Sequence, residues 1–233
     1  MSQHQHYRHL ALIAAMALFM QSLDATILNT ALPAISVSLN ESPLEMQMTI
    51  ISYSLTVALF IPLTGWIADK YGTLNVFRAA VGIFVLGSVA CAMANSLNAL
   101  IWSRILQGMG GALMMPVARL TIIRNVPKTQ LVAAWNAMAM AGLIGPVLGP
   151  IVGGWLVTHA TWHWIFLINI PIGVLGIVFA GRYMPNSTGK INKLDWRGFI
   201  LFAGGLAGVT LGLDLLSEER VNPGITTAIL STG

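Results

Sequence analysis

The chain has 233 residues, of which 56% are hydrophobic and 9% are charged, and its formal net charge is +4. Soluble domains carry about 25% charged residues, so this composition excludes a soluble enzyme and a disordered tail. The single cysteine, Cys91, excludes an internal disulfide framework and a cysteine-based metal cluster. Long apolar runs along the whole chain predict instead an all-α protein, a polytopic bundle of membrane helices.

Seven apolar stretches are long enough to cross a bilayer, whose core needs about 20 residues per helix. An eighth begins near Ile225 and is too short within this sequence. We interpret the first stretch as an uncleaved helix and not a secretory signal, because its apolar core continues past Asp24 as far as Pro33. The predicted spans are 10–32, 47–68, 76–95, 98–120, 131–157, 164–184 and 196–216.

The basic residues predict the orientation of the bundle, because positive charge concentrates on the cytoplasmic side of membrane proteins. With the N-terminus in the cytoplasm, ten of the twelve basic residues flank the inner ends of the spans, and the outer loops hold glutamates such as Glu41 and Glu45. The positive charge therefore indicates anchoring at the inner face and no nucleic-acid partner. The ten residues are Arg8, Lys70, Arg78, Arg119, Arg124, Lys128, Arg182, Lys190, Lys193 and Arg197.

Three ionisable side chains fall inside predicted spans, namely Asp24, Arg104 and Asp214. A charge at this depth costs several kcal/mol unless it is paired or hydrated, so each is a candidate functional residue. At about 1.5 Å per residue, Asp24 lies about 16 Å and Arg104 about 10 Å below the outer face, within reach of an arginine side chain. This geometry predicts a pair or proton relay between the first and fourth spans, and a fixed salt bridge is the alternative. Asp214 lies nearer the outer end of its span, where snorkelling or capping is the simpler role.

The fourth span places three further residues on the face that carries Arg104, because residues three, four and seven positions apart share one side of a helix. They are Gln107, Gly108 and Gly111. We expect Gln107 to orient the guanidinium and the glycines to let another helix approach. Ordinary small-residue packing explains the glycines but not the arginine.

The fifth span has a stripe of glycines at positions i, i+3, i+7 and i+11, which permits close backbone contact with a neighbouring helix. Two prolines four residues apart each delete a helical hydrogen bond and bend the helix. The pattern predicts a kinked helix that rocks against its neighbour as part of a gate, and a plain packing helix is the alternative. The residues are Gly142, Gly145, Gly149 and Gly153, with Pro146 and Pro150.

A short loop, residues 65–72, connects the second and third spans. Gly65 permits close approach, and Gly72 provides a tight turn. We expect Asp69 and Lys70 to pair with partners at the inner face of the membrane.

These patterns together resemble the major facilitator superfamily, in its drug:proton antiporter branch. The similar segments are 23–33, 65–72, 104–112 and 145–154, and the last of these, which includes Gly154, is similar to the antiporter signature. Segments 162–173 and 195–198 resemble the fourteen-span EmrB/QacA-type subfamily and, within it, MdtD-type multidrug transporters.

The resemblance implies a proton-coupled antiporter that exports drugs or other small amphipathic compounds across a bacterial inner membrane. It implies no enzymatic activity, cofactor or metal; the partners are the lipid bilayer, protons and a small-molecule substrate. Asp24 and Arg104 would couple protons, and Asn29, Gln107, Gly108 and Gly111 would orient the substrate or line its path. The gate loop would use Gly65, Asp69, Lys70 and Gly72, and the antiporter helix Gly142, Gly145, Pro146, Gly149, Pro150, Gly153 and Gly154.

The family fold needs two halves that face each other across the substrate path. We expect residues 1–185 to form the N-terminal six-helix bundle, 186–195 a cytoplasmic linker, and 196–233 an extra span with the incomplete start of an eighth. The chain is therefore interpreted as a truncated N-terminal half that lacks its C-terminal half. A non-transporting fragment, or a half-transporter that needs a second polypeptide, is an alternative function, and so is an exporter of a small organic anion.

The sequence departs from the family pattern at two places. Residues 73–75 follow the gate loop where the family usually has basic residues, which weakens the expected ion pairing at the inner face. His163 stands where arginine is common, so that the contact in this outer loop becomes sensitive to pH.

Two other classes of protein fit less well. A seven-helix light receptor needs a lysine within a span for a retinal Schiff base, and no predicted span contains one. A membrane enzyme would show a motif such as HExxH or a phosphate-binding loop, and neither is present. The loose cluster of His4, His6 and His9 is better explained as a solvated tail than as a metal site.

Overall fold

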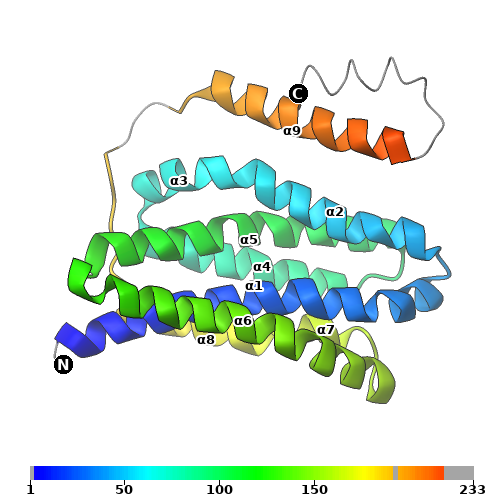
Figure 1. Ribbon diagram of the computed structural model, residues 1–233, viewed down its shortest axis with the longest axis horizontal. Coiled ribbons are helices and arrows are strands. Elements are labelled where there is room, and N and C mark those ends of the chain that lie inside the picture. Colours follow the sequence, from blue (N-terminus) through cyan, green and yellow to red (C-terminus); the bar gives the residue numbers. More distant parts are fainter. Residues whose placement is uncertain (1–2, 191–193, 218–233) are drawn as a thin grey trace. The chain divides into compact units, whose positions relative to one another are not determined.

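The computed structural model describes residues 3–190 and 194–217, and within these ranges every regular element is a helix. The chain divides into two compact units, Met1–Ile191 and Asn192–Gly233. The helices are α1 (Gln3–Leu39), α2 (Pro43–Phe60), the short 3₁₀ helix η1 (Ile61–Leu63), α3 (Thr64–Tyr71), α4 (Thr73–Ala92), α5 (Leu97–Asn125), α6 (Lys128–His159), α7 (Trp164–Leu167), α8 (Asn169–Tyr183) and α9 (Trp196–Ser217) (Figure 1).

Six helical stretches of the first unit are long and apolar enough to cross a membrane, which confirms the first six predicted spans. α9, in the second unit, covers the seventh predicted span. The side chain of Asp214 and the eighth apolar stretch lie outside what the structure describes. The six stretches are Tyr7–Leu39, Pro43–Tyr71, Thr73–Ala92, Leu97–Asn125, Lys128–His159 and Trp164–Tyr183.

The helix ends follow local chemistry. Ser42 begins α2 in a capping box, because its hydroxyl accepts from the backbone N–H of Glu45 and the Glu45 carboxylate accepts from the backbone N–H of Ser42. Ser96 caps α5 in the same position. The predicted end of the first span at Pro33 is wrong: α1 continues through this proline to Leu39, since packed neighbours compensate for one missing hydrogen bond within a membrane helix.

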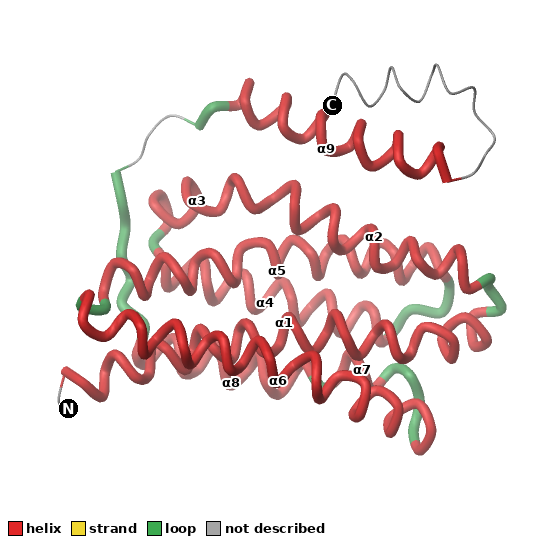
Figure 2. Tube along the Cα trace, in the orientation of Figure 1, coloured by secondary structure: helices red, strands yellow, loops and turns green. Residues whose placement is uncertain are grey.

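The long helices of the first unit lie side by side, and the loops occupy their two ends (Figure 2). α1 packs along α6, α4 packs along α5, and α8 packs against both α4 and α1, as Figure 1 shows for the paired helices. α2 packs on the remaining face of α5. Consequently α1, α4, α5 and α8 meet in the centre of the bundle, where side chains from all four can interact.

Two hydrophobic clusters fill the interior of the first unit at different heights. One includes Met20 of α1 and extends towards the end of the bundle that holds the N-terminus. The other begins at Ile27 of α1 and extends towards Trp162 at the opposite end. Asp24 lies between Met20 and Ile27, so the chain places a buried carboxylate at the boundary between two apolar layers.

Candidate functional site

Asp24 and Arg104 form a buried ion pair in the centre of the bundle. Nη1 of Arg104 donates to Oδ2 of Asp24 at 2.7 Å, and each side chain is 1% exposed. The predicted contact between the first and fourth spans is therefore present, and it joins α1 to α5. Two opposite charges at this depth neutralise each other, which lowers the cost of burying either one.

Gln107 lies one helical turn after Arg104 and holds the guanidinium and the carboxylate together. Its Oε1 accepts from Arg104 Nη1 at 2.5 Å, and its Nε2 donates to Asp24 Oδ1 at 2.8 Å. Nε of Arg104 also donates to the backbone oxygen of Thr49 in α2 at 3.3 Å. These contacts fix the direction of the guanidinium, as expected for Gln107.

Tyr53 of α2 covers the ion pair, although the sequence did not identify it as a site residue. Its ring lies 4.1 Å from Cζ of Arg104, which is a cation–π arrangement. The phenol oxygen accepts from Nε2 of Gln21 at 3.3 Å. An aromatic residue in an apolar stretch is usually part of the core, so its sequence carried no distinguishing signal.

Two neutral polar residues complete the cluster and were also missed. Nδ2 of Asn169, at the start of α8, donates to Asp24 Oδ1 at 3.1 Å and to Ser88 Oγ of α4 at 3.3 Å. Ser88 also accepts from Gln107 Nε2 at 2.8 Å. Both side chains are 0% exposed. The available signal was an asparagine and a serine inside otherwise apolar spans, which is weaker than a charge.

The glycines on the Arg104 face permit the predicted close approach. A Cβ added at Gly108 would lie 2.9 Å from Cβ of Thr56, and one at Gly111 would lie 2.7 Å from the Tyr53 hydroxyl, so α2 packs directly on this face. Asn29 lies apart from the cluster, with an exposed side chain.

The glycine stripe of α6 packs against α1, the helix that carries Asp24. A Cβ at Gly142 would approach Leu18 to 3.0 Å, and one at Gly153 would approach Ile27 to 3.0 Å. Gly145 and Gly149 lie against Ser22 and Thr26 in between. Pro146 and Pro150 point away from this contact and are exposed, and a Cβ at Gly154 would meet nothing within 4 Å in the described part of the chain.

The gate loop lies at the end of the bundle near the N-terminus. Asp69 pairs with Arg124 of α5 at 2.5 Å, although about a quarter of each side chain is exposed. Nζ of Lys70 lies 4.7 Å from the Trp66 ring. Gly72 has φ +85°, which confirms the predicted tight turn. The close approach expected at Gly65 is not seen: the residue is exposed, and an added Cβ would have no described atom within 4 Å of it.

The segment after α8 forms hydrogen bonds with Asp69 of the gate loop and with the first residues of α4. The backbone N–H of Thr73 donates to the carbonyl of Ser187 at 3.1 Å, and the N–H of Gly189 donates to the carbonyl of Asp69 at 3.2 Å. The side-chain oxygen of Asn186 accepts from the N–H of Leu74 at 3.1 Å. These hydrogen bonds anchor residues 185–189 across the ends of α3 and α4.

His163, at the opposite end, stacks on Trp162 with ring centroids 3.7 Å apart. Partial burial lowers the pKa of His163 below its ordinary value, because desolvation disfavours the charged imidazolium. The indole of Trp162 donates to the hydroxyl of Ser38 at 3.0 Å, so this aromatic pair connects the loop to α1.

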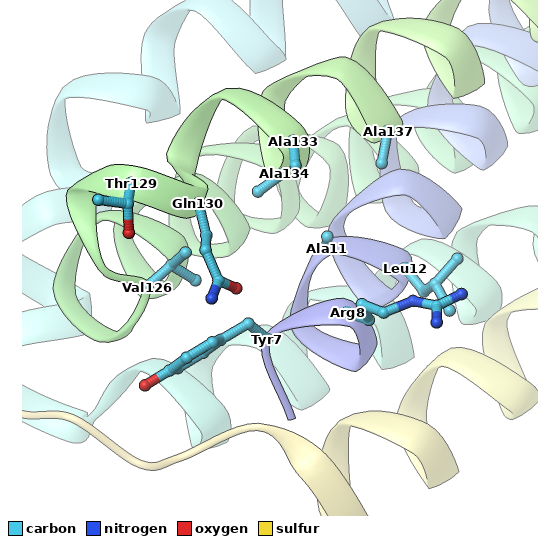
Figure 3. A pocket seen from close by; sticks show the side chains of 10 residues that line it. All are labelled: Tyr7, Arg8, Ala11, Leu12, Val126, Thr129, Gln130, Ala133, Ala134 and Ala137. Atoms are coloured by element: carbon cyan, nitrogen blue, oxygen red, sulfur yellow. The ribbon is translucent and has the colours of Figure 1, made fainter. Parts of the chain in front are cut away.

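A separate cavity of about 530 Å³ opens between the beginnings of α1 and α6. Figure 3 shows Tyr7 and Arg8 on one side of it and Gln130 on the other, with small alanines along the wall. The residues of the Asp24 cluster do not line this cavity.

Comparison with known proteins decides the family. The model of the Major Facilitator Superfamily matches residues 14–230. The chain belongs to the Major Facilitator Superfamily. This finding confirms the resemblance, and the helical membrane bundle with it.

Among the curated proteins of the superfamily, one named "Probable transport protein HsrA" from Haemophilus influenzae is 69% identical, over 97% of this chain and 49% of its own length. One named "Putative multidrug resistance protein MdtD" from Salmonella typhi is 49% identical, over 95% of this chain and 47% of its own length. The chain therefore spans about half the length of the curated relatives it matches.

Solved transporters share the fold at low sequence identity. The proton:xylose symporter XylE has a TM-score of 0.71 at 14% identity, over 98% of this chain and 53% of the symporter. The transporter PepTSo has a TM-score of 0.69 at 16% identity, over 97% of this chain and 51% of that protein. Each match again covers about half of the solved chain.

Proposed function

We propose that this chain is the N-terminal half of a proton-coupled antiporter that exports drugs or other small amphipathic compounds. The observation that carries the proposal is the buried pair of Asp24 and Arg104 between two apolar layers. An ionisable residue within a membrane bundle is costly and marks an ion or substrate pathway more often than a purely structural contact.

The chemistry of the cluster suits reversible protonation. The ionised Asp24 accepts hydrogen bonds from Arg104, Gln107 and Asn169. A proton on this carboxylate cancels its charge, so the attraction that holds the Arg104 guanidinium is lost, and α5 is released from α1. A cationic substrate near Asp24 favours the ionised form, whereas a proton competes with that substrate, which is the exchange that an antiporter requires.

The movement proposed for the gate uses α6. Its glycines contact α1 on both sides of Asp24 in the sequence, since Gly145 faces Ser22 and Gly149 faces Thr26. A smooth contact of small residues lets α6 shift along α1 when the charge on Asp24 changes. The bends expected at Pro146 and Pro150 would then transmit this shift to the ends of the helix.

The orientation and domain boundaries are part of the same proposal. The N-terminus lies in the cytoplasm of a bacterium and the helices cross its inner membrane, since the basic residues gather at the end of the spans that holds Arg8. Residues 1–185 form the six-helix bundle, 186–195 a cytoplasmic linker, and 196–233 the region of the additional span. The pair of Asp69 and Arg124 then lies at the cytoplasmic gate.

Transport across the membrane requires a second half, because the relatives are about twice as long as this chain. A chain that acts alone as a non-transporting fragment is the competing function. A small organic anion is disfavoured as a substrate, since it would have to displace Asp24 from Arg104.

Reconstitution in vesicles separates these functions. The chain is inserted alone, or together with the second half of the Haemophilus influenzae relative, and efflux of the amphipathic cation ethidium is driven by a pH gradient. We expect efflux only with both halves, and we expect Asp24→Asn to abolish its dependence on the gradient. The control is Glu41→Gln, which removes a carboxylate in the loop after α1. Unchanged gradient-driven efflux in Asp24→Asn would show that Asp24 is not the coupling site.

A further inference from the structure

The amide of Asn169 differs from the other groups around Asp24, because half of it is left without a partner. Its Nδ2 donates to Asp24 and to Ser88, and the residue is 0% exposed. Its carbonyl oxygen, Oδ1, is buried and has no hydrogen-bond partner among the described residues. Buried carbonyl groups are nearly always paired, so an exception in the centre of a functional cluster requires an explanation.

Within the described ranges, all the side-chain partners of Asp24 are donors. Arg104 Nη1 donates to Oδ2, and Gln107 Nε2 and Asn169 Nδ2 both donate to Oδ1. This arrangement suits a carboxylate, which only accepts. A protonated Asp24 carries an O–H group that itself needs an acceptor, and the donors now around it provide none.

Asn169 is the residue that is able to supply this acceptor without breaking the hydrogen bond between Arg104 and Gln107. The carbonyl of Gln107 already accepts from Arg104 at 2.5 Å, so turning the Gln107 amide would remove that bond. The carbonyl of Asn169 holds no such bond. Rotation of the Asn169 amide about its Cβ–Cγ bond exchanges Nδ2 and Oδ1 and presents the carbonyl to Asp24.

We propose that Asn169 is the positioning residue for the transported proton, an inference that rests on the proposed function of Asp24. With Asp24 ionised, Asn169 Nδ2–H donates to Oδ1 of Asp24. When a proton binds this oxygen, the Asn169 amide rotates by half a turn about its Cβ–Cγ bond, and the new O–H of Asp24 donates to the carbonyl of Asn169. The proton remains on Asp24, the amide stays neutral, and the cluster gains one positive charge.

The other ionisable groups near this pair come from three helices. Arg104 of α5 contacts Asp24 directly, Tyr53 of α2 lies over the guanidinium, and Cys91 of α4 lies 3.8 Å from Oε1 of Gln107. α6 packs glycines against this part of α1, and α8 contributes the neutral Asn169 amide. The rotation of the Asn169 amide therefore depends on the charge of Asp24 and of the groups that are hydrogen-bonded to Asp24.

The position of Asn169 connects the rotation of its amide to the backbone. It is the first residue of α8 and follows Ile168, which separates α7 from α8. A change in the hydrogen bond between Asn169 and Asp24 therefore acts at the junction between α7 and α8, and not in the middle of a continuous helix.

Infrared titration of the purified 233-residue chain in lipid nanodiscs tests the inference without any transport. The C=O band of protonated Asp24 is identified by its loss in Asp24→Asn, and isotope-labelled asparagine marks the amide carbonyls. In the wild type we expect one asparagine carbonyl band to change with the same pH midpoint as Asp24, and to be constant in Asp24→Asn. This readout does not depend on the folding of an Asn169 variant.

A second measurement uses Asn169→Leu, which removes both the donor and the acceptor of the amide. We expect the C=O band of protonated Asp24 to shift to higher frequency, because its O–H group loses the acceptor that the rotated amide provides. The matched control is Asn136→Leu, at an exposed asparagine of α6, which leaves this band unchanged.

An asparagine band that stays constant while Asp24 titrates overturns the inference and leaves the proposed function intact. An unchanged frequency of the Asp24 band in folded Asn169→Leu overturns it as well. Failure of Asp24 to bind a proton at any pH overturns both the inference and the proton coupling of the proposed function.

Discussion

Arg104 has one of the largest fully buried side chains among the described residues, and its contacts explain how the bundle tolerates it. The carboxylate of Asp24, the amide of Gln107 and the ring of Tyr53 surround the guanidinium from three helices. In the apolar interior such a pair is held by mutual compensation more than by net attraction. Replacing both partners together and replacing only one of them should therefore have different effects on the stability of the bundle.

Replacement of Arg104 by leucine leaves Asp24 buried without its cation. We expect the free energy of unfolding to fall by about 3–5 kcal/mol, and the double variant Asp24→Asn with Arg104→Leu to recover a large part of this loss. Thermal unfolding in detergent, analysed as a double-mutant cycle, provides the measurement. Arg78→Leu is the control at an exposed arginine. Equal losses in the single and double variants would contradict mutual compensation.

His163 gives a pH dependence at the end of the bundle opposite to the N-terminus. Desolvation by partial burial lowers the pKa of His163, whose ring stacks on Trp162. A base with a lowered pKa contributes stability that is complete above its ordinary value, about 6.5, and that is lost as the pH falls through the lowered value in the folded state.

We therefore expect the protection of amides 161–166 against hydrogen exchange, taken relative to the intrinsic rate at each pH, to fall on acidification below that ordinary value and to become independent of pH in His163→Phe. In His163→Arg, which carries a permanent charge, this protection should be low at every pH. Greater protection of the wild type at acidic pH would mean that the stacked imidazolium is favoured after all.

Individual residues also show which parts of the candidate site can be predicted from the sequence. The pairing of Asp24 with Arg104 was predictable, because a buried charge is so costly that two opposite charges at similar depth indicate each other. Ser88, Asn169 and Tyr53 were not predictable, because neutral polar and aromatic side chains occur in many apolar spans. Only the packing of the helices shows that these three belong to one cluster, in which Asn169 donates to Asp24 and to Ser88 and Tyr53 lies over the Arg104 guanidinium.

At the scale of elements, the contact between α1 and α6 depends on the absence of side chains. Gly149 lies so close to Thr26 that an added Cβ would also come within 3.2 Å of the Ile27 backbone nitrogen. The same helix offers a natural comparison at Gly154, where a Cβ meets nothing within 4 Å of the described residues. The glycine stripe is thus a packing surface on the helix of Asp24, whatever movement it also permits.

Gly149→Ala should destabilise the bundle by about 1–3 kcal/mol, because overpacking forces the two backbones apart. Gly154→Ala should be neutral or slightly stabilising, since alanine is the better helix former. Unfolding midpoints of the two variants under identical conditions give the comparison. A larger loss for Gly154→Ala than for Gly149→Ala would be inconsistent with the helix contact described here.

The gate loop provides a second matched pair of glycines. Gly72 has φ +85° and ψ 146°, a backbone conformation that residues with a Cβ adopt at a cost of about 1–3 kcal/mol. The Asn186 side chain also fills the space where a Cβ would stand. Gly72→Ala should therefore lower the unfolding free energy by at least that amount, whereas Gly65→Ala within α3 should not lower it. Similar stability of the two variants would contradict the strained turn.

The helices themselves were largely predictable, because hydropathy and length determine which segments cross a membrane. Their boundaries were less so. α1 passes through Pro33, and the sixth span is divided at Ile168 into α7 and α8. Both features depend on whether neighbouring helices compensate for altered backbone hydrogen bonds. This compensation cannot be predicted from the sequence of a single segment.

At the scale of the whole molecule, the chain is a bundle of the Major Facilitator Superfamily that matches about half of its relatives. The central cluster of this bundle has a carboxylate, a cation and three neutral polar side chains in contact. The fold therefore assembles the charge pair within one half, and alternating access is proposed to require the other. Family membership was predictable from ordered motifs, but the substrate depends on surfaces of both halves.

The central claim is that Asp24 exchanges a proton while it lies in the interior of the bundle. The most direct measurement is a difference titration of protons bound by the wild-type chain and by Asp24→Asn, both in lipid nanodiscs. We expect the wild type to bind one additional proton as the pH falls, with the site half occupied within the range over which the chain stays folded. Superimposable titration curves would show a permanently ionised carboxylate and a purely structural ion pair, and would contradict the proposed coupling.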